Sequence, residues 1–389
     1  MKKPLFLLAL ISLLVSCKES RLSINVREMD FVNKSDVTVQ GTPVDAEQLL
    51  SVKSIGVCDS FLIVQTYDNE AQIYVYSDDY RLVGRFCSIG RAKNEFLEGP
   101  IWFGKQIFRD ADGNALLPLV DTGQGTRLMD LQKSLETQST VIVGQNEFTS
   151  GEIFFAEMNG RRRIIVGSYK SVFLDNDINH VFEDFQPLIV DDVVFCEPHY
   201  AVFHDTAQVK EIRIFSKFDQ YDYKYINGSL FKHPERNLIV QPLTDMDYIF
   251  FFDLDKDKTF AIHQSGSPTF DDEIPAEIGN EITLANGEKI YETKEDAHFA
   301  GGLAYAKSFF MVTYYAGYYD SDGADTSNGA CELMFFDWDG KFLKSVKLDH
   351  FVTNITYDER KHILYSLDTR NDRIISFDLS SVVFDIVKN

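Results

Sequence analysis

Short apolar segments separated by polar turns recur along the chain, and the last two copies show the pattern most clearly. The segment Leu333–Lys341 is an apolar run that ends in aromatic residues, an Asp and a Gly-Lys turn, and Ile374–Leu379 repeats its apolar part about 40 residues later. Between them lie an alternating segment, Phe342–Leu348, and a polar turn, Asp358–His362. Strands and polar turns that repeat with this period are typical of the blades of a β-propeller.

An apolar strand that ends in an aromatic residue or Met before a polar turn marks each blade. These marker positions are Tyr76, Met129, Phe215, Phe252, Phe336 and Phe377. The sequence therefore predicts an all-β, six-bladed β-propeller, formed by residues 36–389 as a single domain. Because two intervals between markers are about twice the basic period, and because Arg163–Leu174 has the features of a degenerate blade, seven blades are the alternative.

Two segments interrupt the repeat, and we interpret them as loop insertions at about 264–298 and 316–330. Elsewhere the short, fully apolar runs suit strands that are buried on both faces, as in stacked blades, whereas a β-sandwich would alternate more cleanly. Near the N-terminus, Asp36–Gln40 alternates as a short strand. We expect this strand to close the ring by pairing with strands from the C-terminal end.

The first residues have the pattern of a bacterial lipoprotein signal. Two lysines precede an apolar stretch, Leu5–Val15, that is too short to span a bilayer, and a Leu-Val-Ser-Cys tetrapeptide ends at Cys17. This tetrapeptide resembles a lipobox, in which cleavage before the Cys leaves a thiol that accepts a diacylglycerol. We predict a signal peptide over 1–16, lipid attachment at Cys17 and a polar tether over 17–35. The alternative is an ordinary leader with an incidental Cys.

The predicted lipid and the charge of the chain together define the expected partners. A lipid on Cys17 anchors an otherwise soluble body, and Lys18 in place of Asp favours transfer to the outer membrane, facing the periplasm or the cell surface. The chain has 389 residues and a formal net charge of −22, which repels phosphate backbones and anionic headgroups. We therefore expect no nucleic acid partner. The expected partners are the membrane through the lipid, an envelope protein, and a glycan or peptide ligand.

Four cysteines remain in the predicted propeller: Cys58, Cys87, Cys196 and Cys331. Each lies in or beside an apolar run, their spacing is irregular, and no Cys-x-x-Cys pair occurs. We interpret them as buried free thiols. A disulfide between Cys58 and Cys87 within one blade is the alternative in an exported protein.

Three stretches resemble TolB-like six-bladed propeller lipoproteins of gut-type Gram-negative anaerobes. They are Leu62–Ser77, Gly90–Pro100 and Phe336–Leu367. Similar proteins read Gly-x-Gly-Pro-x-Glu-Phe in the second stretch, where Gly90, Glu95 and Phe96 match. The chain departs from the motif where Ala and Lys replace the second Gly and the Pro. The resemblance implies a propeller lipoprotein and supplies no catalytic residues.

Candidate chemistry is sparse. The sequence has no Gly-x-Ser-x-Gly elbow and no phosphate-binding Gly-rich loop, so we predict no catalytic residue, metal ligand or cofactor. Three acidic clusters, Asp110–Asn114, Asp253–Asp257 and Asp320–Asp325, combine acids with turn-forming positions. We interpret them as tight turns, and a structural calcium ion is the alternative.

The insertions are the candidate binding segments, because loops that project from a rigid scaffold often carry binding sites. Tyr318, Tyr319, Asp320 and Asp322 follow Gly317 in the second insertion. Exposed Tyr offers an apolar face with a polar rim, which suits sugars or peptides. These four residues are our predicted binding residues.

The predicted function is a non-catalytic, lipid-anchored binding or scaffolding module at the outer membrane, with an unknown ligand. The alternative is a hydrolase or lyase that acts on glycans or peptides in the central channel. Two channel carboxylates about 5–10 Å apart, or a His with an acidic partner, would favour catalysis. A channel mouth lined by Tyr and neutral polar side chains would favour binding.

Overall fold

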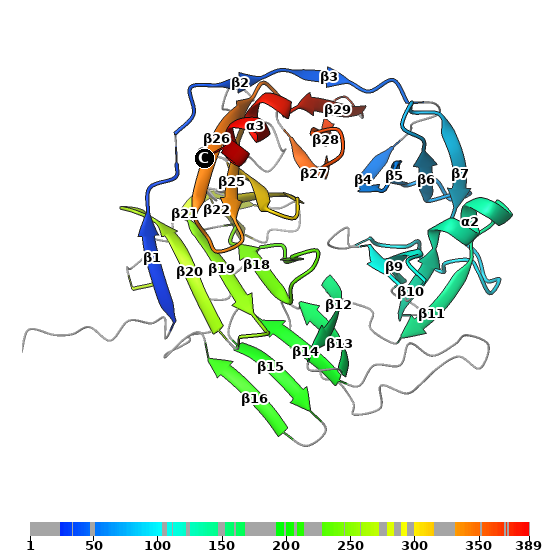
Figure 1. Ribbon diagram of the computed structural model, residues 1–389, viewed down its shortest axis with the longest axis horizontal. Coiled ribbons are helices and arrows are strands. Elements are labelled where there is room, and N and C mark those ends of the chain that lie inside the picture. Colours follow the sequence, from blue (N-terminus) through cyan, green and yellow to red (C-terminus); the bar gives the residue numbers. More distant parts are fainter. Residues whose placement is uncertain are drawn as a thin grey trace, which may run out of the picture.

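A computed structural model of the chain consists of β-sheets arranged as a ring around a central axis (Figure 1). It describes residues 24–46, 51–146, 152–167, 192–213, 228–271, 278–293, 299–314 and 331–388. Within these ranges there are short gaps at 33, 103–106, 111, 122–124, 159–160, 198–199, 206–207, 245, 257, 284–288, 351, 369–370 and 372. For 152–167, 192–213 and 278–293 the description is limited to the backbone.

In the described part of the chain, five sheets have the form of a propeller blade, with strands in sequence order and antiparallel to their neighbours. The first two blades are β4 (Val52–Cys58), β5 (Phe61–Thr66), β6 (Ile73–Tyr76) and β7 (Leu82–Phe86), and β8 (Phe108–Arg109), β9 (Ala115–Asp121), β10 (Gly125–Asp130) and β11 (Ile142–Asn146). A short helix, α2 (Leu131–Thr137), joins β10 to β11.

The other three blades follow in the second half of the chain. They are β17 (Phe231–Lys232), β18 (Leu238–Pro242), β19 (Tyr248–Asp253) and β20 (Lys258–Gln264); β23 (Phe299–Tyr305), β24 (Phe309–Tyr314), β25 (Cys331–Asp337) and β26 (Phe342–Leu348); and β27 (Thr353–Asp358), β28 (Ile363–Asp368) and β29 (Arg373–Asp378). In the first and last blades the first strands, β4 and β27, lie toward the centre of the ring (Figure 1). The predicted all-β propeller is therefore confirmed.

A further sheet lies between the β8–β11 and β17–β20 blades and differs from a blade (Figure 1). It consists of β12 (Glu152–Met158), β13 (Arg161–Gly167), β14 (Asp192–Glu197), β15 (Tyr200–Asp205) and β16 (Gln208–Arg213). Strands β13 and β14 are parallel, which a blade built of successive hairpins does not allow. The prediction of six blades, with seven as the alternative, is wrong, because the chain from β12 to β16 does not repeat the blade.

The marker positions identify the third strand of each of the five blades. Tyr76, Met129, Phe252, Phe336 and Phe377 lie in β6, β10, β19, β25 and β29, and each is at most 1% exposed. The sixth marker, Phe215, lies outside the described residues. A third strand is paired on both edges and covered on both faces by neighbouring blades, so its residues are almost all apolar.

The core consists of the layers between neighbouring blades. Between the β17–β20 and β23–β26 blades this layer is aromatic: the rings of Phe310 and Phe336 lie 5.5 Å apart, and those of Phe251 and Phe310 lie 5.9 Å apart. Another layer, which includes Val64 and Ile374, packs the first blade against the last. Each blade thus buries its faces against the next one, as the fully apolar runs predict.

Residues 24–46 form a belt along the outer rim of three consecutive blades (Figure 1). In this N-terminal belt, β1 (Asn25–Met29) pairs in parallel with β20, β2 (Thr38–Val39) in parallel with β26, and β3 (Gly41–Pro43) antiparallel with β29. The expected pairing of residues 36–40 with C-terminal strands is confirmed. The predicted tether is too long, because the chain joins a sheet at residue 25; the polar composition of β1 reflects an exposed edge strand.

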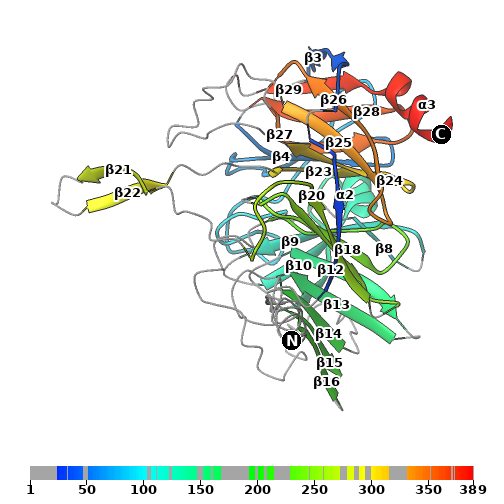
Figure 2. The ribbon, with the colours of Figure 1, turned by 90° about the vertical axis from the view of Figure 1, so that its left-hand side faces the viewer.

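The two ends of the ring differ. Short connections join the first strand to the second and the third to the fourth at one end, here called the turn end; the longest of them in the described blades contains α2, between β10 and β11. The connections between blades, and those between the second and third strands of a blade, lie at the opposite end, here called the insertion end. The connection from β20 to β23 contains a hairpin, β21 (Ile278–Thr283) and β22 (Lys289–Thr293), so the prediction of a plain loop over 264–298 is wrong. Figure 2 shows this hairpin projecting at one end and the C-terminal helix α3 (Ser380–Lys388) at the other.

The described cysteines have no disulfide partner. Cys58, Cys87 and Cys331 are buried free thiols, which confirms that interpretation and overturns the alternative bridge between Cys58 and Cys87. The side chain of Cys196, on β14, lies outside the description. In the described ranges, no helix combines the length and the apolar character that a membrane span needs.

Candidate functional site

Two loops of the first blade form a folded surface at the insertion end, here called the loop platform and made of residues 67–72 and 88–102. The amide of Ile89 donates to the carbonyl of Asn69 at 3.0 Å, and that of Gln72 to the carbonyl of Cys87 at 3.2 Å. Gly99 has a φ of +86°, and a Cβ there would lie 2.7 Å from Oε1 of Gln72. Gly is therefore required where the two loops meet.

Arg127 fixes the longer loop of the platform to the second blade. Its side chain is fully buried in β10, and its guanidinium donates to the carbonyl oxygens of Glu95 and Lys93. The same group lies 4.8 Å from the ring centroid of Phe96, within the range of a cation–π contact. A buried Arg stabilises a structure only when such partners replace water. Arg127 thus makes loop 88–102 part of the rigid ring.

Further hydrogen bonds hold both ends of this loop. Oδ2 of the buried Asp121 accepts from the amide of Leu97 at 2.9 Å. The buried Gln65 side chain donates to the carbonyl of Pro100 and accepts from the amide of Trp102 at 3.4 Å. The loop is therefore ordered by side chains of two different blades.

This packing explains the Gly-Glu-Phe pattern in the sequence. Oε2 of Glu95 accepts from the amide of Ala92 at 2.8 Å and lies over Gly90, where an added Cβ would be 1.9 Å from it. Phe96 is fully buried beneath Arg127. The three matching residues thus form the internal support of the loop.

The platform presents apolar side chains to solvent. Tyr67 is 64% exposed and Leu97 is 40% exposed, although both belong to ordered loops. Nζ of Lys53, on the innermost strand β4, lies 5.5 Å from the ring centroid of Tyr67, and partial burial lowers the pKa of Lys53. An exposed Tyr face beside a cation at the inner edge of the ring is a surface that can contact a ligand.

The predicted site residues are outside the described part of the chain. Cys17, Tyr318, Tyr319, Asp320 and Asp322 all fall there. Strands β24 and β25, which flank the second insertion, end and begin at the insertion end, the same end as the platform. Tyr67 and Leu97 were missed, because their exposure depends on the anchoring of the loops by Arg127 and Asp121.

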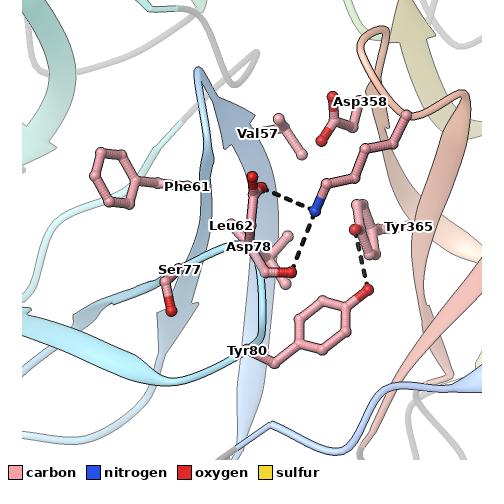
Figure 3. A pocket seen from close by; sticks show the side chains of 9 residues that line it. Val57, Phe61, Leu62, Ser77, Asp78, Tyr80, Asp358 and Tyr365 are labelled. Atoms are coloured by element: carbon pink, nitrogen blue, oxygen red, sulfur yellow. Dashed lines mark hydrogen bonds and ion pairs between the residues drawn. The ribbon is translucent and has the colours of Figure 1, made fainter.

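A crevice between the first and last blades lies at the turn end (Figure 3). Nζ of Lys361 lies 2.8 Å from Oδ1 of Asp78, and Arg360 bridges Asp78 and Asp358 at 3.0 Å and 2.8 Å. These hydrogen bonds lower the pKa of Asp78. The charges satisfy one another, and the crevice has room for about one water molecule. These ion pairs form a polar contact between the first and last blades, where the ring closes. The crevice has no space for a ligand larger than water.

No family model matches the chain, and no curated protein matches it. Among solved structures, a Bacteroides fragilis protein named as exported is similar at 10% identity and a TM-score of 0.48, over 91% of this chain and 98% of that one. A DUF4221 member from Bacteroides vulgatus has 12% identity and a TM-score of 0.45, over 87% and 95%. The WD40 repeats of RRP9 have 10% identity and a TM-score of 0.41, over 87% and 97%. The propeller assignment rests on the strand order of the chain itself.

Histidines with acidic partners lie at the rim of the ring. Nδ1 of His263, on β20, is 3.0 Å from Glu28 of the N-terminal belt. Nδ1 of His350 is 2.7 Å from Asp349, whose carboxylate also accepts from the amide of Gly41 in the belt at 2.8 Å. Both pairs attach the belt to outer strands and are away from the channel.

The described acidic clusters form turns. Oδ1 of Asp110 accepts from the amides of Asp112 and Asn114 at 2.9 Å and 2.8 Å, and Oδ1 of Asp253 accepts from the amide of Lys256 at 3.2 Å. These bonds are typical of Asx turns. Within the described ranges, no group of three or more His, Cys, Asp or Glu residues is placed to hold a metal ion. The cluster Asp320–Asp325 lies outside them.

Proposed function

We propose that the protein is an exported propeller, anchored to the outer membrane by a lipid on Cys17, that binds a ligand at its insertion end without catalysing a reaction. The observation that carries this proposal is the loop platform, in which a fully buried Arg127 holds an ordered loop while Tyr67 and Leu97 remain exposed. A preordered apolar surface loses little conformational entropy on binding. Such a surface is suited to recognition.

The ligand class follows from the side chains and the charge. The ring of Tyr67 offers an apolar face for a sugar ring or a peptide side chain, and Lys53 beside it can donate hydrogen bonds. The net charge of −22 disfavours polyanions. We therefore propose neutral glycans or peptides of the cell envelope as ligands. In this proposal Tyr318, Tyr319, Asp320 and Asp322 add contacts from the second insertion.

The rival function, a hydrolase or lyase, would need acid–base groups in the channel. The pairs of His263 with Glu28 and of His350 with Asp349 are at the rim, where they attach the belt, so they do not support it. A binding or scaffolding role is better supported by the described residues.

The binding proposal is tested on an array of neutral glycans and cell-wall peptides. We expect the mature chain to be retained by a subset of these probes, and Y67A to lose retention because it removes the aromatic face. The matched control is F384A, which removes an aromatic side chain of similar exposure at the turn end. Equal loss in both variants, or no retention of the parent chain, would show that the proposal is wrong. Cleavage of an array probe would show instead that the protein is a hydrolase or lyase.

The anchor is tested separately by intact mass of the membrane fraction. We expect a chain that begins at Cys17 and carries a diacylglycerol, and a C17A variant that loses the modification. An unmodified chain in the membrane fraction would refute lipid anchoring while leaving the binding test unaffected.

A further inference from the structure

Lys53 lies at an irregular point of β4, the innermost strand of the first blade. Val52 pairs with Thr66 and Ser54 pairs with Gln65, so Lys53 is the extra residue of a β-bulge and has no partner in β5. A bulge redirects a side chain from the regular alternation of a strand, and bulges recur beside functional sites. Because β4 lies toward the centre of the ring (Figure 1), Lys53 is at the inner edge of the loop platform.

In the described part of the chain, the ammonium group of Lys53 has no carboxylate partner. The two other described lysines of intermediate exposure each have one. Nζ of Lys344 lies 2.7 Å from Oδ2 of Asp385, and that of Lys361 lies 2.8 Å from Oδ1 of Asp78. Partial burial lowers the pKa of Lys53, because removal from water disfavours the ammonium form. The group is therefore available to a carboxylate that another molecule supplies.

The main chain around Lys53 is held in place before any ligand binds. Nδ2 of Asn354, on β27 of the last blade, donates to the carbonyl of Lys53 at 3.3 Å, and its Oδ1 accepts from the amide of Ile55 at 3.4 Å. The amide of Tyr67 donates to the carbonyl of Ser51 at 3.2 Å. These bonds fix the backbone that carries the ammonium group and the aromatic ring, which lie 5.5 Å apart. Such a preformed arrangement loses little entropy on binding.

This arrangement suits a carboxylate that adjoins an apolar group. The ammonium group of Lys53 donates charge-assisted hydrogen bonds to a carboxylate, and the exposed ring of Tyr67 contacts the neighbouring apolar group. Leu97, on the same platform, adds exposed aliphatic surface. Aliphatic surface favours a peptide side chain over a sugar, because sugar hydroxyls would lose water there without gaining a hydrogen bond.

The charge of the whole protein limits which carboxylates can approach. A formal net charge of −22 repels acidic polymers, such as chains of uronic acids. A peptide with one C-terminal carboxylate and one N-terminal amine has no net charge, so this repulsion is small. A neutral peptide therefore supplies a carboxylate without bringing excess negative charge to the surface.

We propose that Lys53 binds the C-terminal carboxylate of a peptide ligand, with the last side chain of the peptide against Tyr67. This inference rests on the proposed binding function and narrows its ligands to peptides with a free C-terminus. Lys53 is then a specificity-determining residue, because it distinguishes a free C-terminus from an amide or an internal segment of a chain.

Paired peptide probes test this inference. Short peptides with uncharged side chains are immobilised through their N-termini, each with a free C-terminal carboxylate and as the C-terminal amide. We expect the mature chain to be retained by a subset of the carboxylate forms, and about tenfold more weakly by the matching amides. K53M should lose this preference, and K53R should keep it, because a guanidinium preserves the charge and the donors. The matched control is K344M, which removes a lysine of similar exposure on the outer strand β26 and should keep the preference.

Unfolding in urea separates a binding role of Lys53 from a structural one. K53M should leave the urea midpoint unchanged or raise it, because it removes a partly desolvated cation and keeps most of the aliphatic side chain. A lower midpoint for K53M than for the parent chain would show that Lys53 pairs with an acid of the protein itself. The inference would then be wrong.

The remaining outcomes distinguish a failure of this inference from a failure of the proposed function. Equal retention by carboxylate and amide forms, or retention by neutral glycans alone, would leave the binding function intact and refute the role of Lys53. Loss of the preference in K344M as well as in K53M would also refute that role. Retention of the parent chain by no peptide and no glycan would refute both.

Discussion

His263 and Glu28 connect the N-terminal belt to the rim of the ring: Nδ1 of the buried imidazole lies 3.0 Å from each carboxylate oxygen. The other ring nitrogen, Nε2, is 3.1 Å from the carbonyl of Pro268. The belt is therefore attached by this side-chain pair as well as by its strand ladder.

Replacing Glu28 by Gln should loosen the belt without unfolding the ring. Because Glu28 is half exposed, we expect a loss of about 1 kcal/mol or less, and faster hydrogen exchange of the amides of β1. E70Q is the control, since Glu70 is almost fully exposed. Unchanged exchange in E28Q relative to E70Q would show that the strand ladder alone holds β1.

Replacing Arg127 by Met should release the loop platform. The variant removes the donors to the carbonyls of Glu95 and Lys93, and we expect a loss of about 2–4 kcal/mol of unfolding free energy in urea. Amides 90–97 should also lose protection from hydrogen exchange. R81M is the control, because Arg81 is mostly exposed. Similar midpoints for R127M and R81M would contradict the anchoring role.

Acidification should destabilise the protein through His233. Burial lowers the pKa of His233 to about 4, and its neutral Nδ1 accepts from the amides of Glu235 and Arg236 at 2.9 Å and 3.0 Å. Between about pH 6.5 and pH 4 the unfolded chain binds a proton that the folded chain does not, so stability falls as the pH falls, by at most about 3 kcal/mol from this group.

The substitution His233→Asn tests this dependence, because Asn keeps an acceptor and does not titrate. We expect urea midpoints that change less between pH 6.5 and pH 4 than those of the parent chain. H350N, which alters a histidine with a nearby carboxylate partner, is the control. A pH profile of H233N identical to that of the parent would rule out His233 as the source.

The described thiols should be unreactive in the folded protein. Burial raises the pKa of Cys58 and of Cys331 to about 12, and also raises that of Cys87. In a chain that carries both C17S and C196S, we expect no labelling by a thiol reagent in buffer and labelling of all three remaining thiols after unfolding in urea. An added surface thiol, Asp79→Cys, should react at once. Labelling of the native C17S/C196S chain would contradict the buried environment.

The sequence was most informative where a strand is covered on every side. Tyr76 and Phe336 occupy third strands, whose full burial leaves an uninterrupted apolar run that can be recognised without a structure. The blade count failed between Met129 and Phe252, because the strands β12–β15 also contain apolar runs but include a parallel pair. An apolar run indicates that a strand is buried, but it does not indicate whether the strand is parallel or antiparallel to its neighbour.

The candidate site was less predictable, because it depends on contacts between distant residues. Arg127 contacts the loop around Glu95, 32 positions earlier in the chain. One signal was present: Asp121 and Arg127 are charged residues in otherwise apolar strands, and such residues need partners. The polar strand β1 resembled a tether because an edge strand at the rim, exposed on its outer side, has a similar composition.

The parallel register of β1 has a mechanical consequence. A force that pulls the N-terminal end of β1 along the rim, away from Met29, acts along the axis of the strand, so it loads the hydrogen bonds from Asn25 to Met29 together and in shear. Peeling them one at a time would require a pull directed outward from the ring. The belt therefore resists a pull along the rim more strongly than an outward pull.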